Sequence, residues 1–270
     1  MTENKKCNFT GKTKKMTTNR ENGSLYTKIV NGIASLEFGH PASNSFPGVL
    51  LERLEKELHK LSDDDEVKII ILRAEGDRAF CAGASFDELL AVENMQQGKV
   101  FFSGFANVIN AMRSCKKLIT GRIHGKTVGG GVGLAAACDY CFATEQAAIK
   151  LSELSIGIGP FVIAPAIERK MGVAALAELS LAAHEWKNAY WAKEKGLYAR
   201  VFQNTADMDK ELGFFSEKLA SYNPDALLEM KQVLWEGTRN WDSLLQERAA
   251  ISGELVLSEF TRNALSKFRK

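Results

Sequence analysis

The first part of the chain alternates between short apolar runs and segments with a helical spacing of leucines. Residues 26–30 and 33–38 are β-prone runs joined by Asn31-Gly32, a dipeptide typical of a two-residue hairpin. Leucines recur with a helical period through 47–61, and residues 67–72 (VKIIIL) form a continuous apolar run, which is typical of a strand buried on both faces.

The same alternation continues before helices take over. We predict a loop over 73–85, helices over 86–91, 100–113 and 134–138, strands over 118–123 and directly after Asp139, and a last strand over 198–202. After residue 159 the helical segments are 161–171, 174–181, 188–195, 208–221, 226–235 and 241–267.

This order predicts an α/β fold with a parallel sheet and crossover helices. We expect a disordered N-terminal tail over residues 1–24, an α/β core over 25–204 and a helical C-terminal region over 205–270. The tail is polar and cationic and lacks the apolar core of a signal peptide, and Met16 offers a second start.

Composition narrows the class of protein. The 270 residues are 45% hydrophobic and 25% charged, as in ordinary globular domains. A net charge of +2, with lysines and arginines scattered, gives no sign of nucleic-acid binding. No apolar run approaches the roughly 18 residues of a membrane span. The expected setting is the cytoplasm, because five cysteines, an odd number, and the lack of a secretory signal favour free thiols in a reducing compartment.

We predict no metal site. The five cysteines are an odd number, and the CxxC of Cys138 and Cys141 has no second pair to complete a zinc site, so buried free thiols are expected. The four histidines are isolated and are predicted to lie at the surface or to cap turns.

The candidate chemistry lies between residues 125 and 159. Three glycines, 129–131, precede the small-residue helix, and a helix that begins there presents unpaired N–H groups to an anion or a developing oxyanion. The run FCAGASF, residues 80–86, forms a second corner between a strand and a helix. Two such corners on consecutive strands would bring two sets of backbone amides side by side.

Other glycine motifs do not fit. Gly121 and Gly125 have three residues between them where a phosphate-binding loop needs four, and neither GxGxxG nor GxSxG is present.

From about residue 26 to 268 the chain resembles the enoyl-CoA hydratase/isomerase (crotonase) family. The resemblance is carried by FCAGAS-F, GKTVGGGVGLAAACD and LSELSIGIGP. It implies a spiral of ββα units, followed by C-terminal helices that build a homotrimer, often paired as a hexamer. It also implies an acyl-CoA substrate and a place in fatty acid metabolism. Coenzyme A is then part of the substrate, and no separate cofactor is expected.

The resemblance also assigns roles to residues. Ala84 and Gly130 match the two residues whose amides form the oxyanion hole that stabilises an enolate. Coenzyme A is expected along Cys81, Ala82, Ala84 and Phe86. Lys267 and Arg269 are within reach of its phosphates, although a charged terminus is the simpler interpretation.

The departures from the family pattern concern the reaction. Hydratases of the family use two glutamates; the first position is Gly133 here, and the second matches Glu153. Ser85 stands where an aspartate is usual. Apolar neighbours such as Leu151 and Ile156 favour a partly buried Glu153 with a raised pKa.

One carboxylate suffices to move a proton from one carbon to another two bonds away, as in the isomerisation of 3-enoyl- to 2-enoyl-CoA. The alternatives are a 2-enoyl-CoA hydratase, including the methylglutaconyl-CoA type that the run IGIGPFVIAPAIERKMG, which begins at Ile156, resembles, a decarboxylase or thioester hydrolase, and a non-catalytic acyl-CoA-binding protein. Asp87 and Glu88 are the first residues to inspect as a second acid. Acyl-chain length, pathway and the choice between trimer and hexamer stay open.

Overall fold

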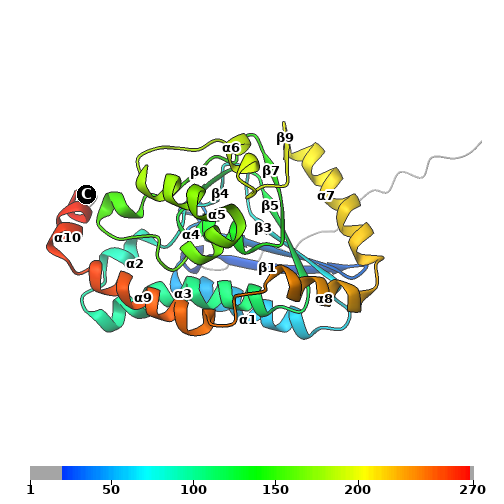
Figure 1. Ribbon diagram of the computed structural model, residues 1–270, viewed down its shortest axis with the longest axis horizontal. Helices are drawn as coiled ribbons and strands as arrows, with labels where there is room; N and C mark the ends of the chain where they lie inside the picture. Colours follow the sequence, from blue (N-terminus) through cyan, green and yellow to red (C-terminus); the bar gives the residue numbers. More distant parts are fainter. Residues whose placement is uncertain (1–19, 268–270) are drawn as a thin grey trace, which may run out of the picture.

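A computed structural model describes residues 20–267 (Figure 1). Most of the predicted tail, residues 1–24, and Cys7 and Arg269 therefore lie outside the described residues. The described residues begin with a short 3₁₀ turn, η1 (Arg20–Asn22). The predicted hairpin follows it, with a positive φ at both Asn31 and Gly32.

The larger of two sheets has six strands within the described residues. In spatial order they are β1 (Ser24–Val30), β2 (Ile33–Gly39), β3 (Ile69–Ala74), β5 (Leu118–Ile123), β7 (Tyr140–Thr144) and β9 (Arg200–Phe202). The edge strand β1 is antiparallel to β2, and every other neighbouring pair is parallel. The predicted parallel sheet is confirmed.

A second, three-stranded parallel sheet consists of β4 (Ala79–Cys81), β6 (Lys126–Val128) and β8 (Ile149–Lys150). The prediction of a loop over 73–85 was therefore wrong at β4. Gly125 allows this sheet to form, because a Cβ at that position would lie 2.2 Å from the carbonyl oxygen of Arg78. Strands of two or three residues are too short to leave a periodic signal in the sequence.

The two sheets and the helices form the expected spiral. Each repeat places one strand in the large sheet and the next in the small sheet, and then returns through a helix. The pairs β3–β4, β5–β6 and β7–β8 are followed by α2 and α3, by α4, and by the short turn η2 (Glu153–Ile156) with α5, respectively. This confirms the fold class of ββα units.

The helices largely follow the predicted segments. They are α1 (Gly48–Asp63), α2 (Phe86–Leu90), α3 (Met95–Ser114), α4 (Gly130–Ala137), α5 (Ala164–Leu181), α6 (Ala189–Glu194), α7 (Thr205–Ala220), α8 (Pro224–Leu234), α9 (Trp241–Leu255) and α10 (Glu259–Ser266). Gly172, with a φ of 82°, interrupts α5 where two helices were predicted. The single helix predicted over 241–267 is instead two helices, because the Ser258 side chain accepts from Thr261 N–H and begins α10.

The C-terminal helices pack on the rest of this chain. In Figure 1, α1, α3 and α9 lie together along one side, while α7 and α10 lie at opposite ends. Trp241 and Leu245 of α9 belong to the main hydrophobic core. Our division of the chain near residue 204 stays a prediction.

Asp139 ties α8 to the large sheet. One carboxylate oxygen accepts from Lys231 Nζ at 2.7 Å and from Ile119 N–H at 2.7 Å, and the other accepts from Trp235 Nε1 at 2.7 Å. The Asp139 and Lys231 side chains are only 4% and 3% exposed. The removal of one partner would leave the other as an uncompensated buried charge.

We expect Asp139→Ala to lower the free energy of unfolding by about 3–5 kcal/mol, because Lys231 would stay buried without a counter-charge. Urea titration followed by circular dichroism measures the change. The control is Asp63→Ala, which breaks the exposed pair with Lys116 and should cost less than about 1 kcal/mol. Equal effects of the two substitutions would contradict the anchoring role of Asp139.

The four described cysteines, Cys81, Cys115, Cys138 and Cys141, are buried and free, as predicted. The described residues contain no group of three potential ligands that could hold a metal ion. Within the same residues no helix has the length and apolar character needed to cross a membrane. The expectation for the histidines was wrong at His124, which is 2% exposed; its burial and the nearby Arg122 lower its pKa to about 4.

Candidate active site

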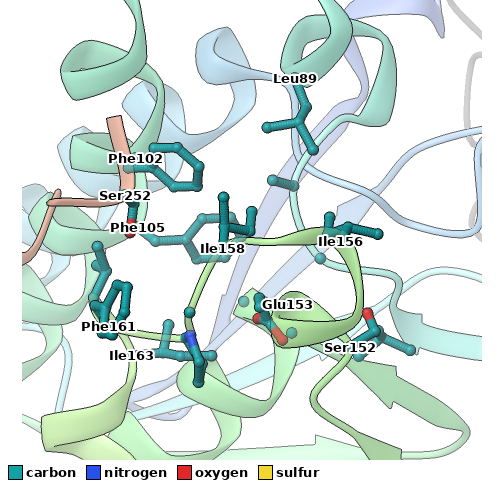
Figure 2. Close-up of a pocket in the computed structure, with 18 of the residues that line it drawn as sticks. Leu89, Phe102, Phe105, Ser152, Glu153, Ile156, Ile158, Phe161, Ile163 and Ser252 are labelled. Atoms are coloured by element: carbon teal, nitrogen blue, oxygen red, sulfur yellow. The ribbon is translucent and has the colours of Figure 1, made fainter. Parts of the chain in front are cut away.

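A cavity of about 420 Å³ lies where the two predicted corners meet the segment that follows β8 (Figure 2). This volume falls within the usual range for a small-molecule site, roughly 300–1,000 Å³. The lining comes from 82–86 and 128–130, from the stretch 150–163, and from α3 and α9. Segments far apart in the sequence thus enclose one space, and most of the side chains that face it are apolar.

The glycine triplet forms one wall of the cavity. Gly129 has φ 52° and ψ −120°, a conformation that side chains disfavour, and it precedes the first residue of α4. The amides at the start of a helix have no partner within that helix, so Gly130 N–H is available to a ligand. A Cβ on Gly130 would lie 2.3 Å from the ring of Phe105, which packs edge-on against Phe46. Only glycine fits at 130.

Ala84 lies on the neighbouring corner. Its bridge partner is Phe46, whose N–H donates to Gly83 O and whose carbonyl accepts from Ser85 N–H. Because successive amides in an extended segment point to opposite sides, this pairing leaves the Ala84 amide facing away from Phe46. A Cβ on Gly83 would lie 3.6 Å from Gly130 N, so the two corners lie side by side, as the sequence predicted.

Glu153 begins η2 and lines the same cavity, between Ser152 and Ile163 in the view of Figure 2. Its carboxylate lies over the Cα of Gly129, where a Cβ would come within 2.8 Å of Oε1. Oε2 is shielded from solvent and has no hydrogen-bond partner among the described residues. Burial raises the pKa of Glu153 to about 7, although the backbone amides of Glu153 and Ser152 counter part of the shift. The group can therefore accept and return a proton near neutral pH.

Among the described residues, Glu153 is the only carboxylate that lines the cavity, so none of them supplies a second acid opposite it. Asp87 is exposed, and Glu88 accepts a hydrogen bond from Gly48 N–H, so neither lines the cavity. At Gly133 a Cβ would lie 2.4 Å from Cγ2 of Ile163, and Ile163 itself lines the cavity. An isoleucine thus fills the space beside the position of the missing glutamate.

The residues predicted to hold coenzyme A divide into two groups. Ala82, Ala84 and Phe86 line the cavity. Cys81 does not belong to the lining; its side chain packs against Gly131, and burial raises the pKa of its thiol to about 12. Lys267 is exposed at the end of the described residues.

Sequence reasoning missed most of the apolar wall. It consists of Leu89, Phe101, Phe102, Phe105, Ile158, Phe161, Val162 and Ile163. The phenylalanines of α3 carry a helical period, but that period does not tell which element or cavity they face. Ser252 of α9 also lines the cavity and was missed, because a serine within a helix gives no signal of its own.

Comparisons with known proteins agree with this architecture. A family model described as enoyl-CoA hydratase/isomerase matches residues 28–263, and the chain therefore belongs to the enoyl-CoA hydratase/isomerase family. The crystal structure of an enoyl-CoA hydratase from Bacillus halodurans superposes with a TM-score of 0.83 at 17% identity, covering 90% of this chain and 99% of that one. The crotonase-like fold is confirmed.

Similar proteins carry names of different reactions. A Bacillus subtilis protein named probable enoyl-CoA hydratase is 27% identical over 238 residues, which cover 87% of this chain and 92% of that protein. An Arabidopsis thaliana protein named peroxisomal Delta(3,5)-Delta(2,4)-dienoyl-CoA isomerase is 28% identical over 194 residues, or 66% of this chain and 68% of that protein. Membership in the family therefore does not identify the reaction, which has to be argued from the residues of the site.

Proposed function

We propose that this protein is an acyl-CoA isomerase that converts 3-enoyl-CoA to 2-enoyl-CoA, with Glu153 as its one acid–base group. The observation that carries the proposal is the single carboxylate in the lining formed by the described residues. A proton shuttle between two carbons needs one such group, whereas family hydratases position a water between two.

The enolate oxygen would accept hydrogen bonds from the amides of Ala84 and Gly130. Both residues line the cavity together with Glu153, and both amides are left out of the neighbouring backbone pairing. Donors fixed before the reaction are worth about 3 kcal/mol each in the transition state, because they need no reorganisation as charge develops. Coenzyme A would lie along Ala82, Ala84 and Phe86, and no separate cofactor is needed.

The proton would move in two steps. The Glu153 carboxylate removes a proton from C2 of the 3-enoyl thioester, and the electron pair of that C–H bond delocalises through the adjacent double bond and the thioester carbonyl as a dienolate. The protonated Glu153 then donates the same proton to C4, which leaves the double bond between C2 and C3. A pKa of about 7 suits both steps, since neither protonation state is strongly disfavoured near neutrality.

The surroundings of Glu153 favour this reaction over hydration. Hydration requires a water held beside C3, and Ile163 packs against Gly133 on the side where a second glutamate would hold one. The cavity wall is rich in aromatic and aliphatic side chains, which offer water few partners.

The test compares purified protein on 3-enoyl-CoA and 2-enoyl-CoA of equal chain length. We expect kcat/KM for isomerisation to exceed that for hydration by at least about tenfold, since general acid–base catalysis serves only the first reaction fully. In heavy water, partial retention of the C2 proton at C4 would indicate transfer by one shielded carboxylate.

Other outcomes point to the alternatives. Faster hydration would establish a hydratase. Loss of carbon dioxide or free coenzyme A would establish a decarboxylase or hydrolase, and binding without turnover would establish an acyl-CoA-binding protein.

We also propose that the chain works in the cytoplasm as a homotrimer or a dimer of trimers. Large exposed apolar side chains on the last helices, including Val233 and Phe260, support an interface between subunits.

A further inference from the structure

Ser252 is a wall residue of the cavity, and its buried hydroxyl has no hydrogen-bond partner among the described residues. The residue is 1% exposed. A serine within a helix usually bonds to a carbonyl one turn earlier, and a buried hydroxyl without a partner is destabilising. In a ligand cavity, a polar atom of the ligand can supply the hydrogen-bond partner that this hydroxyl lacks.

The packing of α9 fixes where this hydroxyl lies. Gly253 is in close contact with Gly98 of α3, since a Cβ on Gly98 would lie 2.8 Å from the Cα of Gly253. Gln246 bonds to Ser103 at 2.8 Å and to Asn107 at 2.9 Å across the same pair of helices. Ser252 therefore cannot move away from the cavity without separating α9 from α3.

The surroundings of Ser252 define the chemistry of its partner. Figure 2 shows it on the side of the cavity where Phe102, Phe105 and Phe161 lie, with Glu153 across the space. Lys150, the one cation of the described lining, donates to the carbonyl of His184. A carboxylate beside Ser252 would be desolvated without a counter-ion, whereas a neutral oxygen would need only the one hydrogen bond available.

We propose that Ser252 forms a polar subsite for the acyl group, and that the preferred acyl chain carries a neutral oxygen, a hydroxyl or a carbonyl, towards its distal end. The inference rests on the proposed use of acyl-CoA and names the kind of acyl group that the cavity takes. The aromatic side chains hold the hydrocarbon part, and the Ser252 hydroxyl bonds to the oxygen.

The test measures binding, independently of turnover, by calorimetry. The ligands are saturated straight-chain acyl-CoA thioesters from butanoyl to octanoyl, together with their terminal hydroxyl, oxo and carboxyl counterparts. At the chain length that reaches Ser252 we expect the hydroxyl or oxo ligand to bind about three- to tenfold more tightly than the plain chain, the usual effect of one neutral hydrogen bond. The carboxyl ligand should bind more weakly than both.

Ser252→Ala should abolish this preference. The matched control is Ser216→Ala on α7, because Ser216 is also buried and its Oγ has no partner among the described residues, yet it does not line the cavity. It should keep the preference of the native chain.

A native protein that binds plain chains best at every length, or a Ser252→Ala variant that changes all ligands equally, would overturn the subsite and leave the proposed function in place. Failure to bind any of the thioesters would remove the proposed function and the subsite together.

Discussion

Replacement of Glu153 by glutamine is expected to reduce kcat for the proposed isomerisation by about 10³-fold or more, because Glu153 is the one carboxylate of the described cavity lining that could carry the proton from C2 to C4. The amide of glutamine fills nearly the same space, so the cavity and the two oxyanion amides should stay in place. Binding of a saturated acyl-CoA, measured by calorimetry, should therefore change by less than about threefold. Steady-state kinetics on 3-enoyl-CoA provides the rate.

The same variant should become more stable than the native chain as pH rises. Burial in the folded protein raises the pKa of Glu153 to about 7, from the 4.5 that is ordinary for a solvated glutamate. Below pH 4.5 both the folded and the unfolded state bind the proton, and between these values the unfolded state loses it first, so native stability falls. Glutamine does not titrate, so the variant keeps the part of the free energy of unfolding that the native chain loses. This difference amounts to at most about 3 kcal/mol above pH 7. Urea titrations across that pH range measure the difference.

Glu88→Gln serves as the control for Glu153→Gln, since the Glu88 side chain accepts from Gly48 N–H and does not line the cavity. Its kcat should stay within about threefold of the native value. If Glu153→Gln retained most of its activity, or if Glu88→Gln abolished it, the assignment of Glu153 as the shuttle would be wrong.

Gly133→Glu is expected to destabilise the fold by more than about 3 kcal/mol. The new Cβ would lie 2.4 Å from Cγ2 of Ile163 and 2.7 Å from its Cβ, in a fully buried part of α4. Overpacking of this kind costs about 1–3 kcal/mol, and a buried carboxylate without a partner adds to it. Thermal unfolding and the yield of folded protein report the loss.

A second substitution, Ile163→Gly, should relieve the overlap in Gly133→Glu. Alanine would not suffice at 163, because the Cβ of Ile163 is itself too close. The double variant should regain at least about 1 kcal/mol over Gly133→Glu and, with a second carboxylate facing Glu153, hydrate 2-enoyl-CoA about tenfold faster than the native chain. Ile163→Gly alone is the control and should not gain hydration. Native-like stability of Gly133→Glu would show that Ile163 does not occupy this space.

The main architecture could be predicted from the sequence wherever an element depends on the residues within it and not on distant contacts. The run 67–72, the Asn31-Gly32 turn and the glycines before α4 each predict their element through apolar continuity, positive φ or a helix start. The resemblance added the roles of Ala84, Gly130 and Glu153. The structure places all three on one cavity, and their roles in catalysis stay predictions.

What could not be predicted depends on contacts between distant segments. The exclusion of a second glutamate depends on Ile163 packing against Gly133, and the sequence gives no hint of that contact. Cys81, in the middle of a recognisable motif, faces the core because β4 is a buried strand and not a loop. Ser252 reaches the cavity only through the close crossing of α9 and α3.

The crossing of α9 and α3 has a consequence for the order in which the parts of the cavity form during synthesis of the chain. The two glycine-containing corners and Glu153 precede residue 160, whereas one wall of the cavity comes from α9 (Trp241–Leu255), which is translated later. In a nascent chain that has folded only its two sheets, Glu153 and the two corners would lie open to water on the side that α9 later covers. If the cavity takes the proposed acyl group, its selection would begin only once α9 has docked against α3 at Gly98 and Gly253.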